Sequence, residues 1–180
     1  MIRDAARQAR LLADIRRFVR EVAIPNEDRV EREDRVPDDL VAAMRKLGSY
    51  GWSIPGQYGG AGLTTEELAL AFIELSQCSV AYRVHGATNA GVGSEAIIQD
   101  GTEEQKRKYL PRLASGELLG CLALTEPGAG SDATSLQATA LRDGDQYVLN
   151  GTKRYITRAF RIYEGTSQIH LLNIGKHLLR

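Results

Sequence analysis

Apolar side chains recur at helical spacing through the N-terminal part of the chain. The first segment places them three or four residues apart, at Ala5, Ala9, Leu12, Ile15, Val19 and Val22. This spacing predicts a helix with one buried face, and Pro25 is expected to end it. Residues 26–36 are mostly charged, so we expect them to form a solvated connection.

Proline, glycine and capping patterns mark the ends of the next two helices. Pro37 suits the first turn of a second helix, and Gly48 suits its C-terminal stop. Thr64 with Glu67 forms a capping-box pattern, which predicts the start of a third helix. This third helix is expected to run to about Gln77.

Two more helices are predicted before residue 118. One is expected to cover about 81–99, where apolar residues continue at helical spacing. Thr102 with Gln105 repeats the capping-box pattern and opens the other. Pro111 and Gly116 are expected to bring that helix to a close.

At about residue 120 the pattern changes from helical spacing to short apolar runs and turn signals. The run 120–125 predicts a buried strand. Residues 136–157 predict strands joined by tight turns at 143–145 and 150–151, where Asp-Gly and Asn-Gly pairs are hairpin signals. Helical spacing resumes from Thr166.

The predicted class is therefore α+β, with three parts in sequence. An all-α domain is expected over 1–118, and a small antiparallel β-domain over 119–157. A further helical segment is expected over 158–180. A chain of 180 residues is long enough to bury a core in such an arrangement.

Charge and metal-ligating residues exclude several classes of protein. The chain carries 23 basic and 23 acidic residues, without the basic excess of a nucleic-acid-binding protein. Two cysteines, Cys78 and Cys121, cannot form a disulfide framework or a four-ligand zinc site, so each is expected in an apolar core. His85, His170 and His177 lack metal-ligand spacing, and no metal is expected.

The chain shows no membrane or export signal, so we expect a cytoplasmic protein. No apolar run approaches the ~20 residues that a membrane-spanning helix needs. The first residues lack the apolar core of a signal peptide. Their arginines are interspersed with Asp4, Asp14 and Glu21, whereas transit peptides avoid acidic residues.

Two glycine-rich stretches are candidates for chemistry. Residues 49–63 predict a loop, because their glycine spacing and context do not fit a dinucleotide-binding turn. In the second stretch, 122–132, Gly128 and Gly130 would let backbone N–H groups approach an anion or a flat ring. From the residues alone, an ordinary polar β-turn is the favoured interpretation of this second stretch.

Residues 123–135, ALTEPGAGSDATS, resemble the flavin-binding signature of the acyl-CoA dehydrogenases. Three further stretches are similar to segments of the same family: 101–117 before the signature, and 149–157 and 161–169 after it. Four matches in the same order form a specific signal. The fold that the resemblance implies is an N-terminal helical domain, a small, partial antiparallel β-domain over 119–157 and a remnant of a C-terminal helical bundle over 158–180.

The resemblance implies FAD as cofactor and assigns residues to it. The residues expected to line the flavin are Leu122, Ala123, Leu124, Thr125, Glu126, Pro127, Gly128, Ala129, Gly130 and Ser131. The resemblance places Tyr155, Ile156 and Thr157 on the other face of the flavin. It also implies a second FAD-contacting segment, which consists of Gly165, Thr166, Ser167 and Gln168. Thr125 is expected to bond the isoalloxazine edge.

The family oxidises the Cα–Cβ bond of an acyl-CoA thioester to a trans-enoyl-CoA. The resemblance places Glu164 at the position of the base that removes the α-proton, while the β-hydride passes to flavin N5. The substrate is expected to lie against Ser131, Tyr163 and Gly165. An apolar site would raise the carboxyl pKa towards neutrality. From the residues alone, Glu164 is more simply a solvated glutamate before a helix cap.

The sequence departs from the family in one place. Members normally carry the rest of the β-domain and most of the helical bundle between the counterparts of 155–157 and 161–164. In this chain residues 155–157 and 161–164 are almost adjacent, so the family's intervening sequence is missing near Thr157. Three explanations are consistent with this closeness of the two segments. The sequence joins two parts of a longer protein, it carries an in-frame deletion, or it is a natural short form. Such a chain is expected to bind FAD weakly and to self-associate.

The implied partners are an acyl-CoA substrate and an electron-transfer flavoprotein as acceptor, within fatty acid metabolism. Relatives are commonly homotetramers, so a homo-oligomer is expected. Two alternatives stay open. One is a non-catalytic remnant that acts as a helical interaction module, and the other is an acyl-CoA oxidase-like flavoenzyme.

Overall fold

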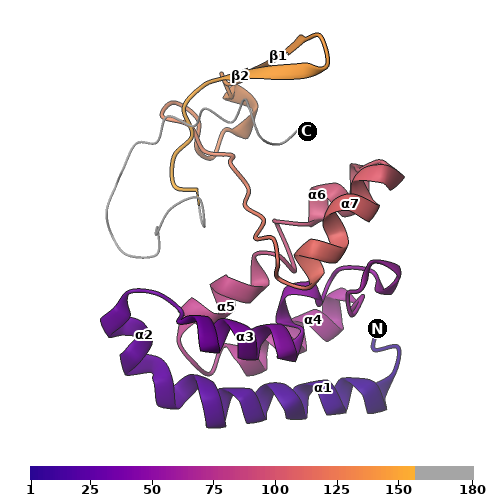
Figure 1. Ribbon diagram of the computed structural model, residues 1–180, viewed down its shortest axis with the longest axis vertical. Coiled ribbons are helices and arrows are strands. Elements are labelled where there is room, and N and C mark those ends of the chain that lie inside the picture. The colour runs from indigo at the N-terminus through magenta and orange to yellow at the C-terminus, as the bar shows by residue number, and fades with distance from the viewer. Residues whose placement is uncertain (157–180) are drawn as a thin grey trace. The chain divides into compact units, whose positions relative to one another are not determined.

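The computed structural model describes residues 1–156, except the side chain of Ala87. The chain divides after Gly120 into two compact units, and each is described by itself. The first unit is helical and the second contains a β-hairpin (Figure 1). The expected C-terminal helix lies outside the described residues. Among the described residues, no helix is long and apolar enough to cross a bilayer.

The first helical stretch is longer than the sequence predicted. Helix α1 (Ala5–Phe18) continues through a π-helical turn (Val19–Ala23) and a 3₁₀ turn (Ile24–Asn26) into α2 (Glu27–Glu33). The expectation that Pro25 ends the helical path was therefore wrong. Pro25 lies in the first turn of the 3₁₀ segment, where a missing N–H costs little.

The charged stretch 26–36 was also wrongly predicted to be a plain connection. It contains α2, whose Arg29 Nε donates to Glu33 at 2.9 Å. The guanidinium of Arg29 also contacts Asp39, at 2.9 and 3.1 Å. These ion pairs explain how so polar a segment forms a helix, because its charges are matched along one face and into the next element.

The next two helices begin and end close to their predicted signals. Helix α3 (Asp38–Leu47) follows Pro37, which is its N-cap, and ends at Gly48 in the left-handed conformation, with φ 75°. Helix α4 (Thr65–Leu75) opens with the predicted capping box of Thr64 and Glu67. The loop between them holds two 3₁₀ turns, Ser49–Gly51 and Gly56–Tyr58.

The predicted helix over 81–99 is two helices, α5 (Val80–Ala87) and α6 (Glu95–Asp100), separated by turns. The chain turns here because Gly93 packs against the backbone of Gly120. A Cβ at Gly93 would lie 2.8 Å from the Thr88 carbonyl oxygen and 3.1 Å from Gly120 Cα. The spacing of apolar residues along the chain carries no information about this contact between backbone segments that are distant in sequence.

Helix α7 (Glu103–Ala114) opens with the second predicted capping box, formed by Thr102 and Gln105. Pro111 lies inside the helix instead of ending it. Gly116, beyond the C-cap, has a φ of 73° and packs against the Tyr50 ring, so the helix exit needs a glycine.

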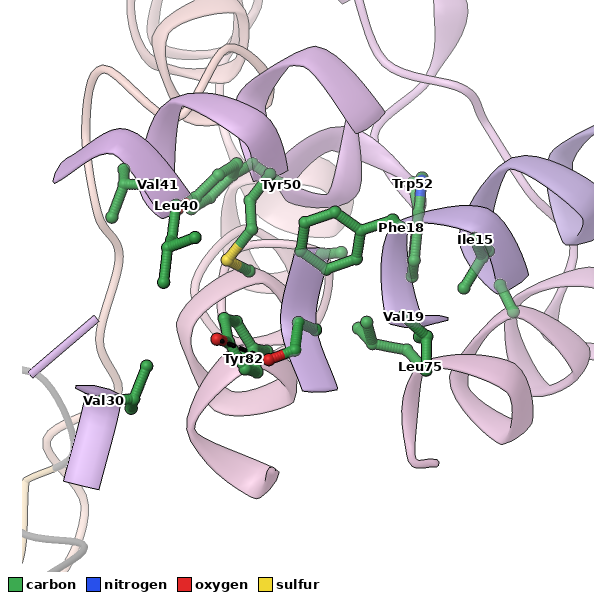
Figure 2. Packing of buried hydrophobic residues seen from close by; sticks show 14 of the residues in the cluster. Ile15, Phe18, Val19, Val30, Leu40, Val41, Tyr50, Trp52, Leu75 and Tyr82 are labelled. Carbon is green, nitrogen blue, oxygen red and sulfur yellow. Dashed lines mark hydrogen bonds between the residues drawn. The ribbon is translucent and has the colours of Figure 1, made fainter. Parts of the chain in front are cut away.

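The core of the helical unit lies among α1, α3, α4, α5 and the loop after α3 (Figure 2). Trp52 is 1% exposed and packs on Phe72, with ring centroids 5.7 Å apart, as expected for a core aromatic. Tyr82 is fully buried and donates its hydroxyl proton to the Ala23 carbonyl at 3.1 Å. This bond ties α5 to the π-helical turn.

The second unit contains an antiparallel hairpin of β1 (Thr139–Asp143) and β2 (Gln146–Asn150). Its turn has Gly144 at φ 62°, which confirms the Asp-Gly signal. Leu141 lies opposite Val148 in the register. The second signal, at 150–151, ends β2, but no further strand follows it up to residue 156.

The prediction of a buried strand over 120–125 was wrong. This run forms no strand, and Leu122 and Leu124 are 50% and 41% exposed. A strand needs a partner for its backbone groups, and β1 and β2 pair only with each other in the described residues. Cys121 is likewise exposed, whereas Cys78 packs against the core, where burial raises its thiol pKa to about 11.

Candidate functional site

Two of the segments expected to flank a flavin lie side by side in the second unit. The Thr125 carbonyl accepts a hydrogen bond from the Arg154 backbone N–H at 2.8 Å. The adjacent Lys153 Nζ donates to the Leu124 carbonyl at 3.0 Å. The structure therefore brings the 122–131 segment next to the residues that lead into Tyr155 and Ile156.

Glu126 occupies the centre of this arrangement. Its side chain is buried and forms an ion pair with Lys153, with Oε1 and Nζ 2.8 Å apart. The backbone N–H groups of Gln137 and Ala138 also donate to its carboxylate, at 2.7 and 3.0 Å. The hydrogen bond from Lys153, followed by those from the two N–H groups, lowers the Glu126 pKa to about 2.

A tight turn carries the glycines of the signature. Glu126 N–H donates to the Ala129 carbonyl at 2.9 Å, and Ala129 N–H donates back at 3.2 Å. Pro127 lies within the turn, where its fixed φ favours the bend. Ala129 is buried, so one side of the turn is anchored within the unit.

Gly128 and Gly130 have no visible reason to be glycine within the described chain. Neither has a positive φ, and a Cβ at either position would meet nothing within 4 Å. Glycine at such positions permits close approach by something outside the chain. With exposed Leu122 and Leu124 on the same segment, this open backbone fits a flat, partly apolar ligand such as a flavin ring.

Asp132 fixes the chain just after Ser131. Its carboxylate accepts hydrogen bonds from the Thr134 backbone N–H at 3.2 Å and from the hydroxyls of Thr134 and Ser135. The hydroxyl of Ser135, first, and then that of Thr134 lower the Asp132 pKa. Asp132 thereby caps the 3₁₀ turn Ala133–Ser135 and leaves Ser131 exposed at the end of the segment.

Tyr155 has an unusual backbone conformation. Its φ is 57°, in the left-handed region that large side chains rarely adopt, and it is 57% exposed. Ile156, the next residue, is buried. Backbone held in a sparsely populated region is often found at functional sites, which makes Tyr155 a candidate site residue.

The sequence did not predict a role for Lys153 or for Asn89. Lys153 lies in the 149–157 stretch, where its proximity to Glu126 has no local signal. Asn89 is fully buried in the helical unit and binds the Leu113 and Leu118 carbonyls and the Gly120 N–H, at 2.7–2.9 Å. It holds the last residues before the candidate flavin segment.

The remaining expected site residues lie outside the described residues. They are Thr157, Tyr163, Glu164, Gly165, Thr166, Ser167 and Gln168. Within residues 1–156, no group of histidine, cysteine and acidic side chains is arranged to hold a metal ion.

Family models account for most of the chain. Residues 5–117 match the acyl-CoA dehydrogenase N-terminal domain, and residues 121–163 match the acyl-CoA dehydrogenase middle domain. The chain belongs to the acyl-CoA dehydrogenase family. The division between the two matched regions falls at the same place as the division between the two compact units.

Curated members of the acyl-CoA dehydrogenase family align with the chain over most of its length. An acyl-CoA dehydrogenase of Bacillus subtilis is 44% identical over 143 residues, which are 79% of this chain and 38% of the relative. Bovine mitochondrial isovaleryl-CoA dehydrogenase is 36% identical over 152 residues, 83% of this chain and 36% of the relative. The chain thus spans less than two fifths of the length of these relatives.

Solved acyl-CoA dehydrogenase structures share the fold. A glutaryl-CoA dehydrogenase in complex with glutaryl-CoA superposes with a TM-score of 0.76 at 34% identity, covering 87% of this chain and 40% of that one. A Bacillus anthracis acyl-CoA dehydrogenase complexed with FAD has a TM-score of 0.74 at 36% identity, covering 86% and 27%. These likenesses confirm the helical N-terminal domain followed by a small antiparallel sheet.

Proposed function

We propose that this chain contributes the N-terminal domain and the flavin-contacting segment of an FAD-dependent acyl-CoA dehydrogenase. The observation that carries the proposal is the pairing of Thr125 and Leu124 with Arg154 and Lys153. It joins two signature segments into one surface whose glycines are open. The family membership and the FAD and glutaryl-CoA complexes of structural neighbours support this assignment.

We assign some residues of the chain to the flavin and others to the acyl-CoA thioester. Gly128 and Gly130 admit the flavin to the backbone, Thr125 bonds its edge, and Tyr155 and Ile156 flank its other face. Ser131, Tyr163 and Gly165 position the thioester of the acyl-CoA. When bound, FAD supplies the acceptor for the hydride that leaves Cβ.

Glu164 removes the α-proton in this proposal. An α-proton of a thioester is only weakly acidic, so hydrogen-bond donors must stabilise the enolate oxygen while the base acts. A base of this kind works near neutral pH when an apolar site raises the pKa of its carboxyl group. Gly165 lets the thioester approach the backbone.

The partners follow from the chemistry of the proposed site. The acyl-CoA class is supported by relatives named for isovaleryl-CoA and glutaryl-CoA. One structural neighbour comes from work on the electron transferring flavoprotein of Acidaminococcus fermentans. It has a TM-score of 0.76 and covers 83% of this chain. This neighbour supports an electron-transfer flavoprotein as the electron acceptor. We also propose a homo-oligomer, a cytoplasmic location and a role in fatty acid metabolism.

Anaerobic reduction tests the function. The purified chain is loaded with FAD, its intact mass is recorded, and butyryl-, isovaleryl- and glutaryl-CoA are added in turn. Bleaching of the flavin bands by one of them is expected, and Glu164→Gln should abolish it. Glu104→Gln, an exposed matched control on α7, should leave it unchanged. Flavin-loaded protein that no acyl-CoA bleaches would overturn the proposed activity.

One observation favours a second candidate, a non-catalytic interaction module. Leu141 and Val148 are exposed on one face of the hairpin and Tyr147 on the other. A module that pairs through these side chains predicts a colourless protein with concentration-dependent association, which light scattering would detect. Rapid peroxide formation on addition of acyl-CoA in air would instead identify an oxidase-like flavoenzyme.

A further inference from the structure

We propose that Glu126 and Lys153 are a positioning pair that holds residues 124–131 in the shape that receives the flavin, and that their charged groups do not contact it. This inference rests on the proposed function. It assigns Glu126 a role through its side chain that differs from simple lining of the cofactor. Three separate observations support it.

The first observation is that both oxygens of the Glu126 carboxylate accept hydrogen bonds inside the unit. Its side chain is 6% exposed and that of Lys153 is 16% exposed. Oε1 accepts hydrogen bonds from Lys153 Nζ at 2.8 Å and from Ala138 N–H at 3.0 Å, and Oε2 accepts from Gln137 N–H at 2.7 Å. A cofactor atom would have to reach a carboxylate that is 6% exposed and already accepts three hydrogen bonds.

The second observation is that the pair joins three segments distant in sequence. Lys153 Nζ also donates to the Leu124 carbonyl at 3.0 Å, two residues before Glu126. Gln137 and Ala138 lead directly into β1. The same two side chains therefore fix the start of the signature turn, the entry of the hairpin and the stretch after β2.

The third observation is the close approach of the backbones around the pair. A Cβ at Gly151 would lie 2.6 Å from Ala138 Cβ and 2.9 Å from Ala138 Cα. The stretch that carries Lys153 is thus packed directly on the segment that donates to Glu126. Because desolvation offsets much of the attraction within a buried ion pair, we assign this pair the role of holding one backbone arrangement and not of adding net stability.

Lys153→Met tests the inference, because it keeps the aliphatic stem and removes the ammonium group. Hydrogen–deuterium exchange of the full chain is followed in peptides covering 122–138, with peptides from α1 and α4 as an internal check that the helical unit stays folded. We expect at least tenfold faster exchange in 122–138 and at least tenfold weaker FAD binding. Lys153→Arg should restore both, and Glu126→Gln should resemble Lys153→Met.

Arg142→Met is the matched control, since Arg142 is an exposed cation on β1. It should leave exchange and FAD binding unchanged. Unchanged exchange in 122–138 for Lys153→Met would overturn the inference, whether or not FAD binding weakens, because weakened binding on an unchanged segment means direct contact. Faster exchange in a chain whose wild type takes up no FAD would support the pair while refuting the proposed function.

Discussion

Asn89 Oδ1 accepts a hydrogen bond from the backbone N–H of Gly120 at 2.8 Å. The same amide group donates to the Leu113 and Leu118 carbonyls. One buried side chain therefore fixes the end of α7 and the last residue of the helical unit. Cys121 follows directly, so Asn89 determines where the candidate flavin segment leaves the helical unit.

Asn89→Ala should destabilise the helical unit by about 2–4 kcal/mol. The substitution leaves the Gly120 N–H and the Leu118 carbonyl without a partner, whereas the Leu113 carbonyl still accepts a hydrogen bond from the Gly116 N–H at 3.1 Å. Each unsatisfied group costs about 1–3 kcal/mol, and both are only partly buried. Urea unfolding followed by far-UV circular dichroism measures the change. Gln99→Ala, which removes an exposed amide from α6, should stay within about 0.5 kcal/mol. Equal unfolding midpoints for the two variants would refute the role of Asn89.

The glycines of the two units should respond differently to alanine. Gly93→Ala forces a Cβ against the Thr88 carbonyl and the Gly120 backbone, and should cost about 1–3 kcal/mol. A Cβ at Gly128 would meet no atom of residues 1–156 within 4 Å, so Gly128→Ala should leave the unfolding free energy within about 0.5 kcal/mol of wild type. Thermal unfolding of both variants measures the difference. A destabilised Gly128→Ala variant would show that this turn is packed and not open.

Acid should weaken the helical unit partly through Glu67. Backbone N–H groups of Thr64 and then Arg3 lower its pKa to about 2, from an ordinary value near 4.5. A lowered pKa contributes stability that is present above the ordinary value and is lost as the pH falls towards 2. Urea midpoints at pH 7, 4 and 2.5 should therefore fall less steeply for Glu67→Gln than for wild type. Parallel curves for the two proteins would contradict this assignment.

The left-handed backbone at Tyr155 should reverse the usual order of alanine and glycine. Tyr155→Gly removes the Cβ that makes φ 57° unfavourable, whereas Tyr155→Ala keeps it. The glycine variant should be more stable than the alanine variant by about 1 kcal/mol. Tyr147, in β2, supplies the control, because glycine there should be the less stable variant. Alanine proving more stable at both positions would refute the strain at Tyr155.

Features set by neighbouring residues could be predicted from the sequence. The capping boxes of Thr64 and Thr102, the end of α3 at Gly48 and the hairpin turn at Gly144 each depend on a few adjacent residues. The resemblance to the family's flavin-binding signature could be seen because residues 123–135 are consecutive in the sequence.

Features set by tertiary contacts could not be predicted. The break between α5 and α6 depends on the approach of Gly93 to Gly120. Pro25 was misinterpreted for a local reason, because proline is tolerated in the first turn of a helical segment as well as at the end of one. The run 120–125 has strand composition, but a strand exists only where a partner supplies hydrogen bonds. The Glu126–Lys153 pair was missed for the same reason, because the two residues are adjacent only in the fold.

The central claim is that residues 122–131 and 153–156 form one flavin-binding surface. Titration of the purified chain with FAD, followed by difference absorption and with the intact mass checked against 19.7 kDa, tests it most directly. The account predicts saturable binding of one FAD per chain, weakened at least tenfold in Gly128→Ala/Gly130→Ala with the unfolding free energy unchanged. Absence of saturable binding by the folded chain, or equal binding by the double variant, would contradict it.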